Sequence, residues 1–483
     1  MALSGSFSTN VGSNWRVYCT WSGTQSISGN YTDVTLKSYW EATSSHGAVR
    51  STATKNGSAS INGSSGSFTF SAGLSGSQRK LVNTRNIRVN HNSDGSKSGV
   101  SLSATLGVNV TLSGTYYGSV TASTTVTLNT IPRASSISSN ANWTAGSNKT
   151  VTISRASTSF THTVRWQVQD TGGTWRTIKT STGVGTSVSS SFTTAQNKDI
   201  FNRMAQNATR PSRIQIETFS GSTSIGGTIS KTGTVTAPSA STVRIANPAG
   251  VSSTSGQGNS TVYIDQNIQV SITRSNSSFT HTLRFKDGNS GSTIYTATGV
   301  GTSHTWSPTT AHRNHMYGKI PNGIEFDGQI DIITYYDGIQ VRGTGNTDIN
   351  YRVKQSVSKP TFSASSISYL DTNSKTTGIT GNNQYIVQGQ SQFRASINSG
   401  ATAKNSATIS SYEVKINGVT KSRTGTGVVD MGAVNTSSNT TMTITAIDSR
   451  GFKTTVSKTV NMIPYSPPTI SATAERLTGF EAQ

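Results

Sequence analysis

Cysteine is almost absent from this chain, since Cys19 is the only one among its 483 residues. A single thiol cannot form an internal disulfide, so the fold must be stable without covalent cross-links. Long apolar runs are missing as well: no stretch of about 18 apolar residues occurs, which excludes a membrane-spanning helix. The opening sequence MALSGSFSTN has neither the basic nor the apolar region of a secretory signal. We therefore expect a protein made in a cytoplasm, without a signal peptide and without membrane insertion.

Acidic residues are scarce, with 19 Asp and Glu against 40 Lys and Arg. A glycosidase pair would have to come from scattered carboxylates such as Asp199 and Glu217, and no spacing selects them. The chain also lacks the GxSxG sequence that would support a Ser-His-Asp triad. His312 and His315 lie three apart, but no cysteine or carboxylate stands beside them to complete a zinc site. We expect no catalytic residues, no metal and no cofactor.

One group of acids is denser than the rest, and it comprises Asp327, Asp331, Asp337 and Asp348. Oxygen-rich loops of this kind can hold calcium. The spacing does not match the DxDxDG loop, however, so we expect solvated loop charges.

The positive charge, +21 in total, is spread along the chain. The ranges 1–133, 134–240, 241–359 and 360–483 each hold 10 Lys and Arg. Proteins that bind nucleic acid usually concentrate these residues on one face, with motifs that position them. We therefore expect no specific nucleic-acid binding. Diffuse charge attracts any polyanion at long range, including a Gram-positive wall rich in teichoic acid, and solubility alone is the other explanation.

Two blocks of sequence occur twice. Phe160–Trp166 returns as Phe279–Phe285, and Thr182–Ser187 returns as Thr298–Ser303. An offset of well over a hundred residues is too long for a solenoid repeat and fits a duplicated domain of the β-sandwich size class.

A histidine stands in each copy of the first block. His162 and His281 lie in apolar rows of alternating residues. Such a histidine is more often a buried, hydrogen-bonded core residue than a ligand, so we expect both to be structural.

Alternation of apolar and polar residues predicts strands throughout. One long example is the row Leu102, Ala104, Leu106, Val108, Val110 and Leu112. Hairpin-type dipeptides punctuate the chain: Asn62-Gly63, Asp94-Gly95, Asp337-Gly338 and Asn417-Gly418. One short helix is indicated where Thr194–Gln196 follows a capping threonine and leads to Ile200, Phe201 and Met204.

Prolines mark the predicted domain boundaries. They stand at Pro132, Pro238, Pro360 and Pro467-Pro468, each after a strand-like run. The predicted domains are an N-terminal sandwich at 1–133 (a glycan-binding or attachment module), Ig-like repeats at 134–238 and 239–359, and an Ig/fibronectin-like domain at 360–466. Residues 467–483 are expected to start a further module or to form a C-terminal tail, either packing on a neighbouring subunit or belonging to a shortened form of a longer protein. The fold class is all-β: a jelly-roll-like first domain followed by Ig/fibronectin III-like domains.

The first domain is rich in aromatic residues. Trp15 and Trp21 alternate with Arg16 and Tyr18 along one run, so the tryptophans are expected to face the core. Exposed rings flanked by polar groups are suited to glycans, because a ring is flat and has little entropy to lose. The candidate glycan contacts are Tyr18, Tyr116 and Tyr117.

Two sets of motifs resemble a known family. In the first domain they are Asn90–Lys97, Ser113–Gly118 and Thr130–Ser135; near the other end they are Ala446–Gly451 and Ile463–Pro468. These runs resemble the minor structural proteins of siphophages that infect Gram-positive bacteria. The resemblance implies a tail-tip or tail-fibre component built of Ig-like or fibronectin-like modules. It carries over no binding residues.

The expected function is therefore that of a virion protein. We expect a structural component of a siphophage tail tip or fibre, made in the host cytoplasm, that contacts wall glycan or teichoic acid during adsorption. Its expected partners are other tail proteins and further copies of itself, because open sandwiches leave sheet edges to pair. Two alternatives remain: a tail-associated enzyme that degrades wall polymer, and a bacterial surface adhesin, which would normally need an export signal.

Overall fold

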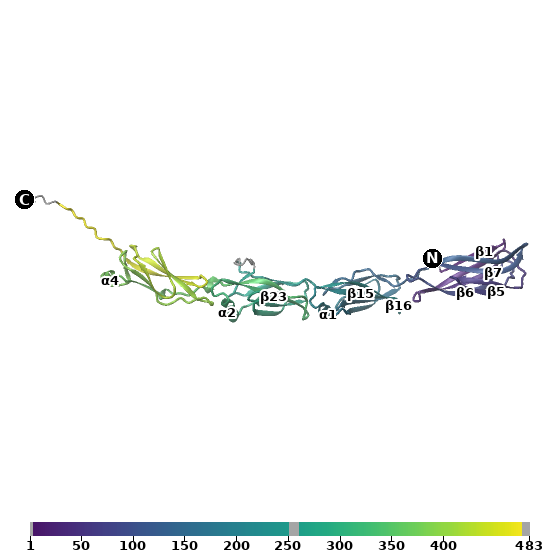
Figure 1. Cartoon of the computed structure of the whole chain (residues 1–483), viewed down its shortest axis with the longest axis horizontal. Coiled ribbons are helices and arrows are strands. Elements are labelled where there is room, and N and C mark those ends of the chain that lie inside the picture. Colours follow the sequence, from purple (N-terminus) through teal and green to yellow (C-terminus); the bar gives the residue numbers. More distant parts are fainter. Residues whose placement is uncertain (1–2, 251–259, 476–483) are drawn as a thin grey trace, which may run out of the picture. The chain divides into compact units, whose positions relative to one another are not determined.

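The computed structural model describes residues 3–250 and 260–475, whose course is drawn in Figure 1. The chain forms two compact units, Met1–Pro238 and Ser239–Gln483. We use the predicted boundaries as names: the first domain is 1–133, module 2 is 134–238, module 3 is 239–359 and module 4 is 360–466. No strand pairing among the described residues crosses these boundaries. The first compact unit therefore comprises the first domain and module 2, and the second comprises modules 3 and 4.

The first domain is an antiparallel sandwich. In its described residues one four-stranded sheet runs in the order β1 (Ser4–Val11), β2 (Trp15–Ser26), β3 (Tyr31–Ala42) and β6 (Arg79–Asn90), and the other in the order β5 (Ser64–Ser71), β4 (Thr54–Ile61), β7 (Lys97–Leu112) and β8 (Thr115–Leu128). One apolar core lies between them and includes Trp15, Trp21 and Trp40. The prediction that Trp15 and Trp21 face the core is therefore confirmed. As in a jelly roll there are two four-stranded sheets, but neighbouring strands are mostly joined as hairpins.

Modules 2, 3 and 4 share one strand order. In module 2 the large sheet has the order β10 (Trp143–Thr144), β16 (Thr223–Thr236), β15 (Thr209–Ser220), β12 (Phe160–Gln169), β13 (Trp175–Val184). Its small sheet has the order β14 (Ser187–Ser189), β11 (Thr150–Ser154), β9 (Ser136–Ile137). In module 3 the large sheet has the order β18 (Thr261–Tyr263), β25 (Gly345–Arg352), β23 (Glu325–Tyr336), β20 (Phe279–Lys286), β21 (Thr293–Val300), and β24 (Ile339–Gln340) also pairs with β23. Its small sheet has the order β17 (Thr242–Ile245), β19 (Ile268–Thr273), β22 (Ser303–Trp306). In module 4 the large sheet has the order β27 (Tyr385–Val387), β33 (Lys453–Ile463), β32 (Thr440–Asp448), β29 (Ile409–Ile416), β30 (Val419–Arg423). Its small sheet has the order β26 (Ile367–Asp371), β28 (Phe393–Ile397), β31 (Gly427–Gly432).

In each module the large sheet begins with a short strand parallel to the last strand of that module. The pairs are β10 with β16, β18 with β25 and β27 with β33. Module 4 therefore repeats the fold of the duplicated pair, which its sequence does not make obvious. The predicted all-β tandem of sandwiches is confirmed.

The few helices connect strands. The predicted one is α1 (Thr194–Met204), which Thr193 and Gln196 cap by exchanging side-chain to backbone hydrogen bonds. Its counterpart α2 (Thr310–Gly318) begins with the same arrangement at Thr309 and His312. The remaining short helices of the described residues are α3 (Gln355–Ser358), η1 (Ala364–Ser366) and α4 (Ser374–Thr380).

Three of the four predicted hairpin turns have the expected backbone. Asn62-Gly63, Asp337-Gly338 and Asn417-Gly418 each place both residues at positive φ, as a type I′ turn requires. Asp94-Gly95 is different, because only Gly95 has a positive φ. It lies in the connection from β6 to β7, which joins strands of different sheets and so has no hairpin to close.

The two repeated sequence blocks contact each other within each module. His162 Nδ1 lies 2.9 Å from the Val184 carbonyl oxygen, and His281 Nδ1 lies 2.9 Å from that of Val300. Because a carbonyl can only accept, each Nδ1 carries the proton. The Nε2 of His281 then accepts from the Ser241 hydroxyl at 2.9 Å. Both rings are fully buried, so the predicted structural role is confirmed.

This arrangement predicts how stability depends on pH. Burial lowers the pKa of His281 below its ordinary value of 6.5. Below pH 6.5 the unfolded chain therefore binds a proton at this histidine more readily than the folded chain does, so the free energy of unfolding decreases as the pH falls. We expect the free energy of unfolding of the second unit to drop by up to about 1.4 kcal/mol per pH unit below that point. Urea unfolding at several pH values in this range gives the free energy of unfolding at each pH. That free energy should depend less steeply on pH in His281→Gln than in the unchanged protein, and equal pH dependences would contradict the assignment.

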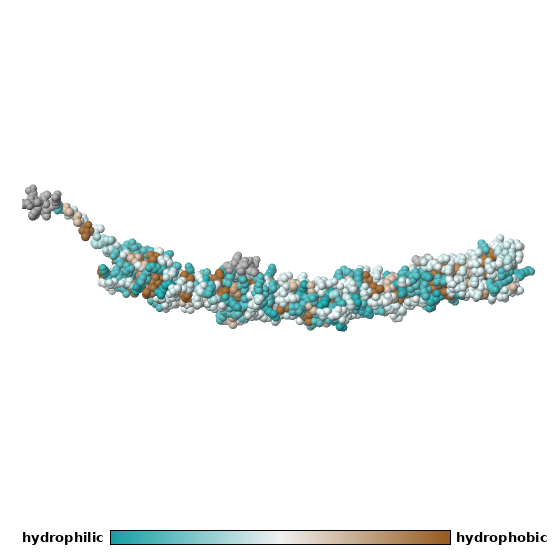
Figure 2. Space-filling view, in the orientation of Figure 1, coloured by the Kyte–Doolittle hydropathy of each residue, from teal (hydrophilic) through white to brown (hydrophobic). Residues whose placement is uncertain are grey.

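The surface carries few large apolar side chains. Hydrophilic and neutral residues cover most of the visible face in Figure 2, and apolar ones form small groups. Two strongly exposed examples are Ile379, with 85% of its surface accessible, and Ile470, with 91%. Ile379 lies on α4 of module 4, and Ile470 follows that module in the chain.

Candidate functional site

The outer face of the sheet β1-β2-β3-β6 gathers aromatic and charged side chains. Trp15, Val17, Cys19 and Trp21 point into the core, so the alternate residues of β2 point outward. Strand pairing aligns them in rows across the sheet. These rows, which we call the outer face, are Arg16–Glu41–Arg79, Tyr18–Tyr39–Leu81, Thr20–Lys37–Thr84, Ser22–Thr35–Asn86 and Thr24–Asp33–Arg88, with Tyr31 beyond them.

Two arginines meet at one carboxylate on this face. Glu41 accepts a hydrogen bond from Arg16 Nε at 2.7 Å and another from an Arg79 terminal nitrogen at 3.0 Å. Glu41 is only 8% exposed. Burial alone would raise its pKa, but the hydrogen bonds from Arg16 and Arg79 outweigh burial, so the pKa of Glu41 lies below its ordinary value. The carboxylate stays ionised and fixes both guanidinium groups.

Tyrosine rings complete the support of these arginines. The guanidinium carbon of Arg79 lies 4.2 Å from the centre of the Tyr18 ring and 6.0 Å from that of Tyr39. Arg16 lies 4.8 Å from the Tyr18 ring. The Arg79 side chain nevertheless keeps 44% of its surface exposed. It is a cation held in one orientation with hydrogen-bond donors free for solvent or a ligand, and the planar guanidinium suits phosphate and carboxylate.

A second arginine and tyrosine lie further along the same face. The guanidinium carbon of Arg88 lies 3.6 Å from the centre of the Tyr31 ring, and Arg88 pairs with Asp33 at 3.1 Å. Exposed Lys37 stands between the two arginines. Neighbouring cationic rows are four residues apart on β3, which corresponds to roughly 13 Å. The outer face therefore carries cations at intervals along its strands, an arrangement suited to an extended polyanion.

The three predicted glycan contacts do not form one site. Tyr18 lies on the outer face, whereas Tyr116 and Tyr117 lie on β8 of the other sheet. Tyr116 is 66% exposed and donates to Asn109 Oδ1 at 3.2 Å. Tyr117 packs against the core of the first domain. Sequence reasoning missed Arg79 as the partner of Tyr18, because strand pairing alone brings β6 beside β3.

The first family motif closes one end of the first domain. His91 Nδ1 lies 2.7 Å from the Gly95 carbonyl oxygen, and His91 Nε2 lies 2.8 Å from the Thr32 hydroxyl. The backbone N–H of Ile131 also donates to the Gly95 carbonyl, at 2.9 Å. A β-carbon on Gly95 would lie 1.9 Å from the Ile131 carbonyl oxygen, so only glycine fits. This motif therefore anchors the chain that leaves the domain.

The second family motif joins module 4 to module 3. It contains the turn between β32 and β33, where Asp448 accepts from the backbone N–H groups of Arg450 at 3.0 Å and Phe452 at 2.8 Å. Arg450 Nε donates to the Ile320 carbonyl of module 3 at 3.0 Å. Phe452, 8% exposed, belongs to the apolar core of module 3. We call the contact of Asp448–Phe452 with module 3 the module joint.

The acidic group of module 3 differs from the prediction. Asp327 and Asp331 lie on β23 and Asp348 lies on β25, so these three are strand residues and the expectation of loop charges was wrong for them. The Asp331 carboxylate pairs with Lys286 at 3.5 Å. Asp337 does lie in a turn. Across residues 3–250 and 260–475, no three His, Cys, Asp or Glu side chains gather as a metal site would require. None of the helices in this part of the chain is long and apolar enough to cross a membrane.

Some solved structures resemble the chain weakly. A tetra-tandem repeat from the extending region of a large adhesion protein is 13% identical, with 90% of this chain and 96% of that chain covered and a TM-score of 0.29. The ICAM-5 D1–D4 ectodomain fragment is 10% identical, with the same coverages and a TM-score of 0.27. Fibronectin(III)-like modules of Clostridium thermocellum CbhA are 14% identical, covering 46% and 94%, with a TM-score of 0.15. These TM-scores are too low to support any argument about function.

The sequence itself gives a firmer relation. No curated protein matches it. A family model described as a siphovirus protein of unknown function matches residues 13–247 and again residues 233–483. Together these two matches span nearly the whole chain, in agreement with the resemblance seen in its motifs. The chain therefore belongs to this family of siphovirus proteins.

Proposed function

We propose that the chain is a structural component of a siphophage tail tip or fibre, and that its first domain contacts an anionic polymer of the host cell wall. The observation that carries this proposal is the outer face, where Glu41 and Tyr18 hold Arg79 in place while leaving it exposed. Membership of a siphovirus family supports a place in the virion. The chain acts by binding, without catalysis.

Teichoic acid suits this face better than a neutral glycan does. A sugar stacks on an open ring, but guanidinium groups already lie over the Tyr18 ring. Those groups suit phosphate oxygens, which they can bind in a bidentate way. The net charge of +21 adds long-range attraction to the same kind of polymer. Wall glycan is the alternative ligand, and binding to isolated walls with and without teichoic acid distinguishes the two.

Binding through several copies would make weak single contacts sufficient. An exposed cation on an open sheet face gives modest affinity by itself, and several copies in one tail raise the effective concentration of each further contact. The strands at the sheet edges, β1 and β6 or β5 and β8, offer unpaired backbone groups to neighbouring copies or other tail proteins. The proposed partners are therefore tail proteins, further copies of the chain and host wall polymer.

Gold-labelled antibodies against the purified chain test its place in the virion. We expect them to mark the tail tip or a fibre in electron micrographs and to block adsorption to host cells. Antibodies against a cytoplasmic host protein serve as the control. Particles that stay unlabelled while the antibodies still bind the denatured chain in infected lysates would show that the chain is not part of the virion surface.

A further inference from the structure

Module 4 carries a pocket at the position where module 3 receives its neighbour. In module 3, Tyr263 at the end of β18 pairs with Arg352 at the end of β25, and Phe452 of module 4 lies beside them. In module 4, Val387 at the end of β27 pairs with Ile463 at the end of β33 in the same parallel arrangement. The shared strand order makes Val387 and Ile463 the counterparts of Tyr263 and Arg352.

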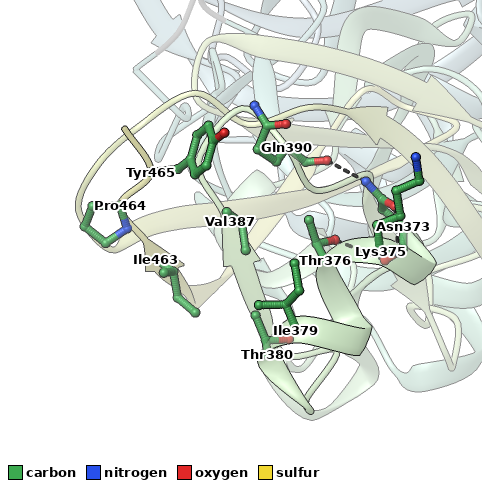
Figure 3. Close-up of a pocket in the computed structure, with 10 residues that line it drawn as sticks. All are labelled: Asn373, Lys375, Thr376, Ile379, Thr380, Val387, Gln390, Ile463, Pro464 and Tyr465. Atoms are coloured by element: carbon green, nitrogen blue, oxygen red, sulfur yellow. Dashed lines mark hydrogen bonds between the residues drawn. The ribbon is translucent and has the colours of Figure 1, made fainter. Parts of the chain in front are cut away.

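The counterpart position in module 4 is open. It forms a pocket of about 490 Å³, lined on the apolar side by Ile379, Val387, Ile463, Pro464 and Tyr465 and otherwise by Asn373, Lys375, Thr376, Thr380 and Gln390. Figure 3 shows Ile379 on one side of the hollow, Ile463 and Pro464 on the other, and Val387 between them. The surface that these residues expose to the pocket is mostly apolar, and Ile379 is 85% exposed. In module 3 the equivalent position is occupied by Phe452 of module 4, which is buried.

The sequence that leaves this pocket repeats the sequence that begins module 4. Pro360-Thr361-Phe362-Ser363-Ala364 returns as Pro468-Thr469-Ile470-Ser471-Ala472. In module 4, Phe362 packs on the Tyr412 ring, with ring centres 5.5 Å apart. Its counterpart Ile470 is 91% exposed. Phe362 packs against the core of the module that it begins, so a module of the same fold that begins at Pro468 would give Ile470 a core to join.

We infer that the pocket is half of a second module joint, and that its occupant is the β-hairpin turn of a further module of this fold that begins along Pro468–Ala472. The occupied joint shows what such a turn presents. An apolar side chain enters the pocket as Phe452 does, and a neighbouring polar group bonds a backbone carbonyl as Arg450 does with Ile320. The pocket takes a protein module, and the outer face of the first domain has no part in it.

An extended form of the full chain tests the inference. Residues 361–483 are repeated after Pro468, so that a second module 4 follows the first. A Val387→Cys substitution in the first copy places a thiol in the pocket, and buried Cys19, whose pKa burial raises to about 12, does not compete for an alkylating reagent. We expect alkylation of the Val387→Cys thiol to be slower by about tenfold or more in the extended protein than in the original chain.

Two controls decide what causes the protection. Arg450→Ala with Phe452→Asp in the added copy should restore fast alkylation, because the turn loses both contacts. A Val428→Cys thiol, on an exposed position of the same module, should react at one rate in every protein. Equal alkylation of the Val387→Cys thiol with and without the added module would overturn the inference, and so would protection that survives the turn substitutions.

A peptide keeps the test decisive if the added module does not fold. A cyclic peptide of residues 446–454, supplied at millimolar concentration to the original chain carrying Val387→Cys, should slow alkylation, and the Phe452→Asp peptide should not. No slowing by the unmodified peptide would then reject the joint.

Discussion

Replacing Phe452 by alanine is expected to destabilise the second unit by about 3–5 kcal/mol, the usual cost of truncating a buried phenylalanine. Phe452 is 8% exposed and packs in the core of module 3, although it lies in the turn between β32 and β33 of module 4. Its loss leaves a cavity at the module joint, and Arg450 then bonds Ile320 without apolar cover. For a unit of this size the midpoint of thermal unfolding should fall on the order of 10 °C.

Calorimetry of the full chain measures this effect. Val428→Ala is the control, because Val428 lies in the same module and is half exposed. Substitutions at such surface positions usually change stability by about 0.5 kcal/mol or less. The unfolding transition of the first unit should stay where it is in both variants. A Phe452→Ala protein that unfolds like the Val428→Ala protein would mean that the joint contributes nothing to the stability of module 3.

Replacing Arg79 by alanine is expected to weaken binding to teichoic-acid-bearing walls by about tenfold or more, the range for a hydrogen bond to a charged group. Glu41 keeps its bond from Arg16 at 2.7 Å, so the sheet should remain folded. Arg79→Lys keeps the charge but loses the planar fork, and its affinity should fall between those of the other two proteins. Sedimentation of labelled chain with purified walls gives the affinity.

A charge-matched control separates the site from general attraction. Arg176→Ala removes one positive charge from module 2, where Arg176 is exposed and pairs with Asp170 at 3.1 Å. Its loss lowers the net charge of the chain just as Arg79→Ala does. We expect Arg176→Ala to bind nearly as the unchanged protein. Equal weakening by both substitutions would assign binding to the overall charge and remove the outer face from the account.

Local patterns in the sequence predicted the elements and part of the core. Alternation placed Trp15 and Trp21 inward, because a strand sends successive side chains to opposite faces. Thr193 marked the start of α1, since a threonine at that position can accept from the backbone three residues on. The buried histidines followed from their apolar rows. Each of these features depends on residues close together in the chain.

Features that depend on distant residues could not be predicted in the same way. Arg79 bonds a carboxylate 38 positions earlier in the chain, and the pairing of β3 with β6 that brings them together includes an irregularity between Ser38 and Tyr39. Arg450 bonds a carbonyl 130 positions earlier. The sequence around Arg450 predicts only a turn, because no residue near it in the chain indicates which module packs against that turn. The fold class was therefore accessible from the sequence, whereas the outer face and the module joint were not.

The most direct measurement is binding of the purified, labelled chain to isolated Gram-positive walls, with and without teichoic acid, at low and high salt. A face that holds Arg79 in place should bind walls that carry the polymer, keep part of that binding at high salt, and lose it when the polymer is removed. Binding that high salt abolishes equally on both kinds of wall would contradict the proposal. The positive charge would then serve only as general attraction to polyanions.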